Sequence, residues 1–210
     1  MAEGIVKYSC EYRSTELPEI DLAELNFWRE RLKTRGLVGQ RPDLYEGYGY
    51  GNLSMRLPPF ESSPAERRFV ITGTQTGHIK SLAPDHYSLV TACYPLENRL
   101  IAEGPSRPSA ESLTHGMLYA LDSAIRFVFH VHCPALWHSA AALQIPISDQ
   151  SVPYGSPELA SEIERLFLDG SLRNRCIFSM GGHEDGLVSF GASAEEAGSI
   201  IFNLLNSIVA

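Results

Sequence analysis

The sequence predicts an α/β fold in which a mixed, largely antiparallel sheet is covered by helices. Strand-like segments are grouped in hairpins, and amphipathic helices lie between these groups. The 210 residues are 44% hydrophobic and 10% aromatic, which suits one compact core. No internal repeat or low-complexity tract is visible. We therefore expect a single domain over residues 1–210, with a polar leader at residues 1–18.

The first predicted helix covers residues 21–35, where apolar side chains recur on one helical stripe and Gly36 can end the helix. A Gly- and Tyr-rich turn then leads into an alternating strand at residues 52–57. After a loop rich in Pro, Ser and Glu, a second strand at residues 69–72 runs into a loop of glycine and hydroxyl residues at 73–77. These elements indicate an antiparallel hairpin with a polar loop at one end.

The second half of the chain alternates strands and helices. Strands are predicted at residues 87–93, 98–103, 127–132, 176–180 and 187–190, and helices at residues 110–121, 135–143, 157–168 and 193–209. Ser109 is expected to cap the helix at 110–121, which places Glu111 in its first turn. A glutamate there is favourable against the helix dipole, but its position after a Pro- and Ser-rich loop also suits a catalytic carboxylate.

Two histidines at the end of the strand FVFHVH indicate a metal site. Side chains alternate along a strand, so His130 and His132 point to the same face. Neutral imidazoles bind zinc and related ions, and catalytic sites use three protein ligands with one open position. The best third ligand is His183 in MGGHEDG, although Glu184 or Asp185 could coordinate instead. Strand histidines that only satisfy a carbonyl remain the alternative.

Composition excludes several other functions. The net charge is −8, with 17 basic against 25 acidic residues and no basic cluster, which disfavours a nucleic-acid surface. The apolar runs are too short for a membrane helix, and the N-terminus has no signal-peptide core, so we expect a soluble cytoplasmic protein. The four cysteines form no CxxC pair, which argues against a disulfide framework and a thiolate zinc site.

Five motifs occur in an order that resembles the class II aldolase/adducin family, whose best-known enzymes are fuculose-phosphate and ribulose-phosphate aldolases. They are GNLSMR, FVITGTQTG, EGPSRPSAE, FHVH and GGHEDGLVSFGAS with the AEEA that follows. The resemblance covers roughly residues 21–210. It implies a three-layer α/β domain with a central sheet between helices, usually assembled as a homotetramer. It also implies a catalytic role for Glu111 and a zinc site at His130, His132 and His183.

The activity implied by the resemblance is that of a metal-dependent lyase. A ketose, possibly a sugar phosphate, would be cleaved between C3 and C4 through a metal-stabilised enediolate, with Glu111 as general acid or base. Alternatives on the same fold are a sugar-phosphate dehydratase or epimerase and a hydroxy-acid decarboxylase. A non-catalytic assembly module like adducin is an alternative of another class. The divalent ion is expected to be Zn²⁺, and the substrate a small, anionic molecule.

The chain departs from the sugar-phosphate aldolases at two points. Relatives have PSSE where this chain has PSAE, so Ala110 replaces one phosphate-binding hydroxyl; His183 precedes glutamate rather than glycine. Local groups could still form an anion pocket, because glycines allow close approach and hydroxyls and amides donate hydrogen bonds. The residues proposed for this pocket are Gly51, Asn52, Thr74, Thr76, Gly77 and Ser109, with Arg107 able to grip phosphate or carboxylate.

Overall fold

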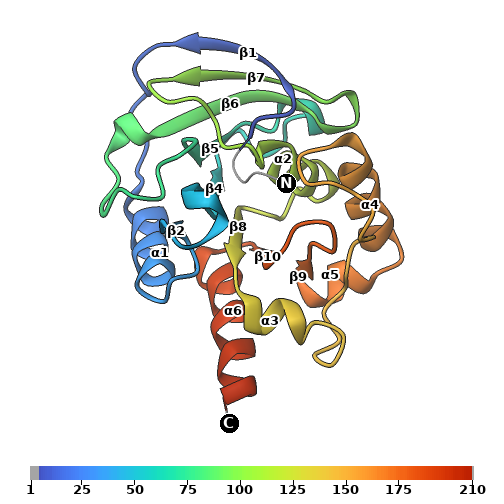
Figure 1. Ribbon diagram of the computed structural model, residues 1–210. Helices are drawn as coiled ribbons and strands as arrows, with labels where there is room; N and C mark the ends of the chain where they lie inside the picture. Colours follow the sequence, from blue (N-terminus) through green and yellow to red (C-terminus); the bar gives the residue numbers. More distant parts are fainter. Residues whose placement is uncertain (1–4, 210) are drawn as a thin grey trace.

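A computed structural model describes residues 5–209 of the chain. Eight strands form one sheet in the order β1-β7-β6-β5-β4-β8-β10-β9 (Figure 1). Their bounds are β1 Ser9–Ser14, β4 Asn52–Arg56, β5 Phe69–Thr72, β6 Tyr87–Tyr94, β7 Arg99–Gly104, β8 Phe127–His132, β9 Ile177–Ser179 and β10 Gly186–Gly191. Only the β1–β7 pair of this sheet is parallel. The expected mixed, largely antiparallel sheet is therefore confirmed.

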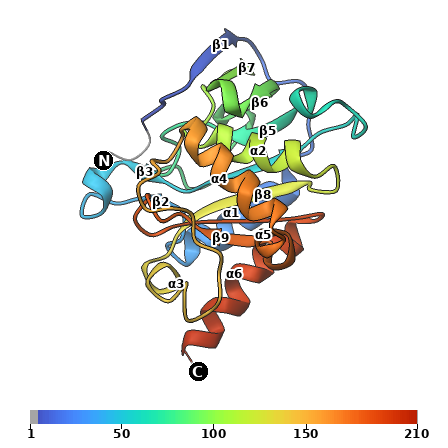
Figure 2. The ribbon, with the colours of Figure 1, turned by 90° about the vertical axis from the view of Figure 1, so that its right-hand side faces the viewer.

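Helices cover both faces of the sheet. They are α1 Ala23–Thr34, α2 Ser112–Leu121, α3 Pro134–His138, α4 Pro157–Leu168, α5 Ser171–Arg175 and α6 Ala194–Val209. In Figure 2, α4 and α5 lie in front of the sheet and α1 lies behind it. Side chains alternate accordingly, since Ile71 and Val128 pack in the core under α2 and α4, whereas Val70 and Phe129 pack under α1 and α6. The three-layer expectation is confirmed.

The sheet positions the histidines because β8 is an interior strand, between β4 and β10. His130 is paired with Asn52 of β4 on one side and with Val188 of β10 on the other. His132 is paired with Gly186, the first residue of β10. The end of β8 therefore meets the start of β4 and the turn that precedes β10, and both bring further polar residues to the same edge.

The structure differs from the sequence-based expectation at the N-terminus. Residues 9–14, within the expected leader, form edge strand β1, whereas residues 1–4 lie outside the described part of the chain. Its apolar side chains, Cys10 and Tyr12, alternate with exposed residues but are only partly buried against the core, so the strand carries a short and weak hydrophobic pattern. It pairs along β7, and the hydroxyl of the preceding residue, Tyr8, donates to the carbonyl of Ser109 at 2.8 Å. The N-terminal segment thus supports the loop before α2.

Other boundaries shift by a few residues. Helix α2 begins at Ser112, so Glu111 is its N-cap residue rather than a first-turn residue. A tight turn precedes the helix, in which the carbonyl of Ser109 accepts from both the backbone N–H and the hydroxyl of Ser112. Helix α3 covers Pro134–His138 rather than residues 135–143. Turns follow it, and Gln144 has a φ of 55°. Two short strands that pair only with each other, β2 Gly39–Gln40 and β3 Gly49–Tyr50, and helix α5 were not expected.

Candidate metal centre and adjoining cleft

Three buried histidines converge at the end of β8. One ligand nitrogen from each of His130, His132 and His183 lies within 4.8 Å of the others. His130 and His132 share a face of the strand, as the alternation predicts, and His183 comes from the turn between β9 and β10. All three side chains are at most 5% exposed. This arrangement can hold a divalent metal ion through three imidazoles.

The environment of His130 fixes which nitrogen can bind a metal. Its Nδ1 lies 3.1 Å from the carbonyl oxygen of Leu187, and because a carbonyl can only accept, Nδ1 carries the proton. The lone pair is then on Nε2, which is buried and has no hydrogen-bond partner within residues 5–209. Burial is the main cause that lowers the pKa of His130, followed by His183 and His115. The neutral imidazole is the form that coordinates metals, so this histidine fits the site.

His132 has the same electrostatic character. Burial lowers its pKa first, and the neighbouring imidazoles of His130 and His183 lower it further. The ring centroids of these three histidines are separated by 4.9 to 5.2 Å, with the rings at steep angles to one another. Three neutral imidazoles at this spacing surround a space rather than stack, which again suits a shared cation.

The turn that presents His183 is tightly built. Its backbone N–H donates to the carbonyl of Met180 at 3.1 Å, and its own carbonyl accepts from Gly186 at 3.0 Å. A Cβ atom at Gly182 would lie 2.0 Å from the carbonyl oxygen of Val152, so only glycine fits there. These bonds leave one geometry for the turn and direct His183 towards β8.

The two alternative ligands in this turn lie elsewhere. Glu184 is exposed, and the carboxylate of Asp185 accepts a hydrogen bond from the hydroxyl of Tyr45 at 2.8 Å. Neither belongs to the histidine group whose ligand atoms converge. Among the three candidates that the sequence left open, the structure brings His183 to His130 and His132.

Glu111 lies between the histidines and a neighbouring cleft. It is 2% exposed, its Oε2 accepts from the hydroxyl of Thr114 at 2.9 Å, and its Oε1 lies 3.6 Å from Nδ1 of His183. Thr114 is three residues later, so the first turn of α2 orients the carboxylate. A buried carboxylate beside a metal-binding group has the placement that a general acid or base requires.

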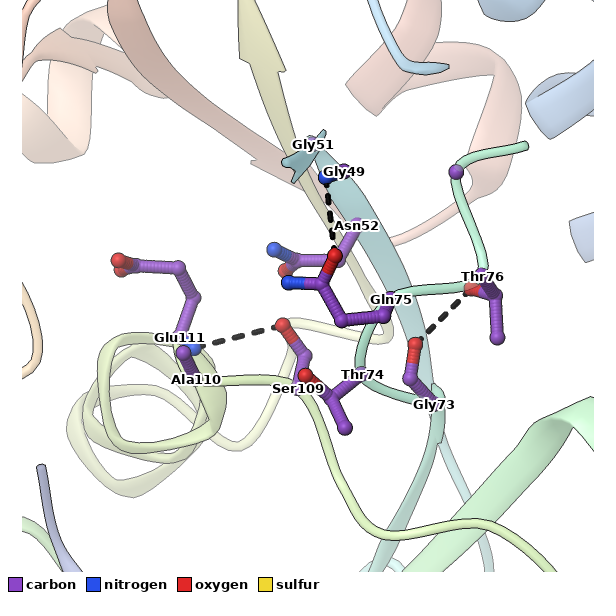
Figure 3. Close-up of a pocket in the computed structure, with 11 residues that line it drawn as sticks. Gly49, Gly51, Asn52, Gly73, Thr74, Gln75, Thr76, Ser109, Ala110 and Glu111 are labelled. Atoms are coloured by element: carbon purple, nitrogen blue, oxygen red, sulfur yellow. Dashed lines mark hydrogen bonds between the residues drawn. The ribbon is translucent and has the colours of Figure 1, made fainter. Parts of the chain in front are cut away.

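The cleft contains most of the residues predicted to bind an anion. Glu111 is on its wall, and the lining also includes Gly51, Asn52, Thr74, Thr76, Gly77 and Ser109. Figure 3 shows Asn52 entering from β4, whereas Ser109 and Glu111 enter from the start of α2. The space between these groups is about 340 Å³ when the open solvent at the mouth of the cleft is counted with it.

Arg107 is the predicted anion-binding residue that the structure does not bring to the cleft. Its side chain is exposed, and its guanidinium stacks 4.9 Å from the ring centroid of Tyr12 on β1. The backbone explains this direction, because the carbonyl of Arg107 accepts from Thr74 and so faces the cleft loop. The sequence could not show this, since it did not predict β1.

Several residues near the site had no sequence signal. Gln75 lines the cleft with a φ of 57°, and its Oε1 accepts from the backbone N–H of Gly49 at 3.1 Å. The rings of Tyr45 and Tyr154 lie against His132 and His183, with centroid separations of 4.6 and 4.5 Å. These side chains come from loops distant in sequence, so no local spacing marks them.

Comparison with known families agrees with this geometry. Residues 41–207 match the family described as Class II Aldolase and Adducin N-terminal domain, which covers well over half of the chain. The chain belongs to the class II aldolase and adducin family. No curated protein matches it.

Solved structures of this family share the fold. L-fuculose-1-phosphate aldolase from Thermus thermophilus superimposes with a TM-score of 0.58 at 19% identity, covering 88% of this chain and 89% of that one. The sugar-phosphate aldolase from Thermotoga maritima gives 0.60 at 17%, covering 89% and 94%. YgbL from Escherichia coli, a candidate aldolase/epimerase/decarboxylase, gives 0.58 at 21%, covering 89% and 88%. At these identities the similarity establishes the class II aldolase fold and not a particular activity.

Proposed function

We propose that this chain is a metal-dependent carbon–carbon lyase that cleaves a small, hydroxylated, anionic carbonyl compound. The observation that carries the proposal is the convergence of three buried histidines with Glu111, whose Oε1 lies 3.6 Å from His183, on the wall of a polar cleft. Family membership supports the same class of reaction. A ketose phosphate is the substrate we would test first, since two of the compared structures are sugar-phosphate aldolases.

The proposed metal ligands are His130, His132 and His183, with Zn²⁺ as the expected ion. Three histidine nitrogens match the ligand preference of zinc and leave one coordination position open. A divalent ion bound there would act as a Lewis acid for negative charge that develops on a substrate oxygen. The fit rests on the buried Nε2 of His130, whose other nitrogen is occupied by the carbonyl of Leu187.

Glu111 is the proposed general acid or base. The hydroxyl of Thr114 donates to its Oε2 and limits rotation of the carboxylate. The backbone N–H of Glu111 lies 3.4 Å from the hydroxyl oxygen of Ser109, which fixes the turn before α2. Proton transfer by a positioned side chain contributes roughly 10²- to 10⁴-fold to a rate. We infer that Glu111 takes the proton of a substrate hydroxyl as the adjacent carbon–carbon bond breaks and returns it to the carbon of the released fragment that gained the electron pair.

The anionic end of the substrate is proposed to bind where the cleft meets the start of α2. No lysine or arginine of the described residues lines the cleft; apart from the carboxylate of Glu111, its polar groups are hydroxyls, amides and backbone N–H groups. The beginning of a helix attracts negative charge, and Ser109 and Asn52 add hydrogen-bonding groups. Such neutral donors suit phosphate or carboxylate. Ala110, which replaces a serine of the sugar-phosphate aldolases, leaves the site with one hydroxyl donor fewer but does not abolish it.

A purely structural, adducin-like role is disfavoured by energetics. Buried ionisable groups, even when they are paired, often stabilise a fold less than apolar residues of similar size, which would serve an assembly module better. Here Glu111 and three histidines are all at most 5% exposed within one cluster. A role in metal binding and catalysis would explain why these four ionisable side chains are buried together despite the loss of folding stability.

The test is a cleavage assay on zinc-loaded protein with ketose 1-phosphates, in which the released triose phosphate is measured. Glu111→Gln keeps the shape of the side chain and should lower kcat by about 10²-fold or more while the zinc content stays the same. Glu158→Gln is the matched control, because Glu158 is an exposed glutamate in the first turn of α4. It should behave as wild type.

Three outcomes would contradict the proposal. Full activity of Glu111→Gln would assign proton transfer to another residue. Zinc binding without cleavage of any ketose phosphate would exclude the aldolase reaction, and turnover of the same compounds by dehydration or epimerisation, or of hydroxy acids by decarboxylation, would identify the alternative. Absence of zinc after reconstitution would remove the metal-dependent reaction.

We also propose that the protein assembles as a homotetramer and works in the cytoplasm. Tetramers with active sites at subunit interfaces are implied by the family resemblance. Light scattering coupled to size-exclusion chromatography measures the assembly directly, and a monomer at micromolar concentration would contradict the tetramer.

Scattered cysteines such as the buried Cys93 and Cys133, which form no disulfide among the described residues, suit a reducing compartment such as the cytoplasm. Among residues 5–209, no helix has the length and apolar character needed to cross a membrane.

A further inference from the structure

A tyrosine-rich loop lies against the histidine cluster from one side. Tyr45 and Tyr50 belong to the segment between β2 and β4, about 80 residues before His132 in sequence. The ring of Tyr45 meets the ring of His132 edge-on, with centroids 4.6 Å apart, and Tyr50 lies 5.5 Å from the same imidazole. The two tyrosines also contact each other, with centroids 5.0 Å apart. His132 is therefore held against an aromatic wall rather than against solvent.

Tyr45 also reaches the turn that carries His183. Its hydroxyl donates to Oδ2 of Asp185 at 2.8 Å across 140 residues of sequence. Asp185 is 8% exposed and lies two residues after His183. The carbonyl of Asp185 accepts from the backbone N–H of Cys133 at 2.8 Å, directly after His132. Tyr45 thus touches one histidine by its ring and, by its hydroxyl, the turn of another.

The backbone at both ends of this contact has positive φ values. Tyr45 and Glu46 are consecutive residues with φ values of 48° and 57°, and Asp185 has a φ of 64°. Aspartate tolerates this left-handed region, whereas a bulky residue such as tyrosine seldom occupies it. Such conformations persist where the surrounding structure determines them, and they concentrate at functional sites. The hydrogen bond between Tyr45 and Asp185 joins two of these segments.

We propose that Tyr45 and Asp185 form a clamp that holds His132 and the His183 turn in the geometry for metal binding. This inference rests on the metal centre of the proposed function. Tyr45 acts through other residues, so it is a positioning residue and Asp185 is its anchor rather than a ligand. Contacts that orient metal ligands from outside the coordination shell change metal affinity by roughly 10- to 100-fold when they are removed.

The experiment uses the full chain loaded with Co²⁺ alone, because the visible spectrum of cobalt reports the arrangement of its ligands. Tyr45→Phe keeps the ring against His132 and removes the bond to Asp185. We expect it to release Co²⁺ to excess chelator at least tenfold faster than wild type and to shift the absorption bands. Tyr48→Phe is the matched control, since Tyr48 is 39% exposed in the same loop. It should match wild type in both measurements.

Substitutions at Asp185 test the clamp from its other end. Asp185→Asn keeps an oxygen that accepts from Tyr45, and asparagine tolerates a positive φ, so its release rate should stay within about threefold of wild type. Asp185→Gly removes the acceptor with a residue that also suits this backbone, and it should accelerate release as Tyr45→Phe does. It serves as the second variant if Tyr45→Phe does not fold.

The outcomes separate the clamp from the metal centre itself. Release rates for Tyr45→Phe or Asp185→Gly within twofold of wild type, with normal metal content, would overturn the clamp and leave the proposed function standing. Loss of Co²⁺ from Asp185→Asn at saturating metal would overturn it by identifying Asp185 as a ligand. A wild-type protein that binds no Co²⁺ after reconstitution would overturn both proposals.

Discussion

Acidification should destabilise the metal-free protein through a histidine that is not a proposed ligand. His115 lies on α2, one turn after Glu111, and its side chain is fully buried. Its Nδ1 lies 2.7 Å from the hydroxyl oxygen of Ser54, and burial lowers its pKa to about 3. The folded protein therefore keeps His115 neutral throughout the mildly acidic range, whereas the unfolded chain protonates it near pH 6.5.

The sign and size of the effect follow from this difference in pKa. Because the unfolded state binds the proton first, the contribution of His115 to stability is complete above about pH 6.5 and is lost as the pH falls towards 3. Between pH 7.0 and pH 5.5, an unfolded pKa of about 6.5 gives a loss of about 1.3 kcal/mol in the free energy of unfolding. His130 and His132, whose pKa values burial also lowers, add losses in the same direction.

Urea unfolding of chelator-treated protein at the two pH values measures this loss. His115→Asn lowers stability at both values, so the readout is the change with pH, which should be smaller than in wild type by about 1.3 kcal/mol. His78→Asn is the control, since His78 is exposed, and it should show the full wild-type change. An equal loss in His115→Asn and wild type would refute the assignment of a buried neutral imidazole at this position.

Two further substitutions test the site. His130→Ala should bind zinc about 100-fold more weakly, because each ligand of a structural zinc site contributes on the order of 3 kcal/mol to the free energy of zinc binding. Competition with a coloured chelator measures the zinc affinity, and an unchanged affinity would remove His130 from the ligand set. Arg107→Ala should change KM by less than about twofold, because its guanidinium stacks on Tyr12 outside the cleft. A tenfold rise in KM would instead show that Arg107 reaches the substrate.

Local patterns determined much of the fold. The run FVFHVH becomes a strand with the expected bounds, and helix α4 has the expected bounds as well. Alternation within β8 also places His130 and His132 on one face, because this property depends only on neighbouring residues. The sequence therefore predicts two of the proposed ligands and the strand that carries them without knowledge of other contacts.

Tertiary contacts decided which other groups join them. Strand β1 has no buried residue and is defined by its pairing with β7, so its own pattern is too weak to predict it. The guanidinium of Arg107 stacks on Tyr12 of that strand, so its direction could not be predicted without β1. Tyr45 reaches Asp185 across 140 residues, and local spacing carries no information about contacts of that range. The sequence by itself determined the strand and the type of ligand, and it named His183 as the best third ligand. The packing of distant loops decided among the three candidates for that ligand, which predicted residues line the cleft, and which side chains hold the histidines, because those positions depend on contacts between segments far apart in the chain.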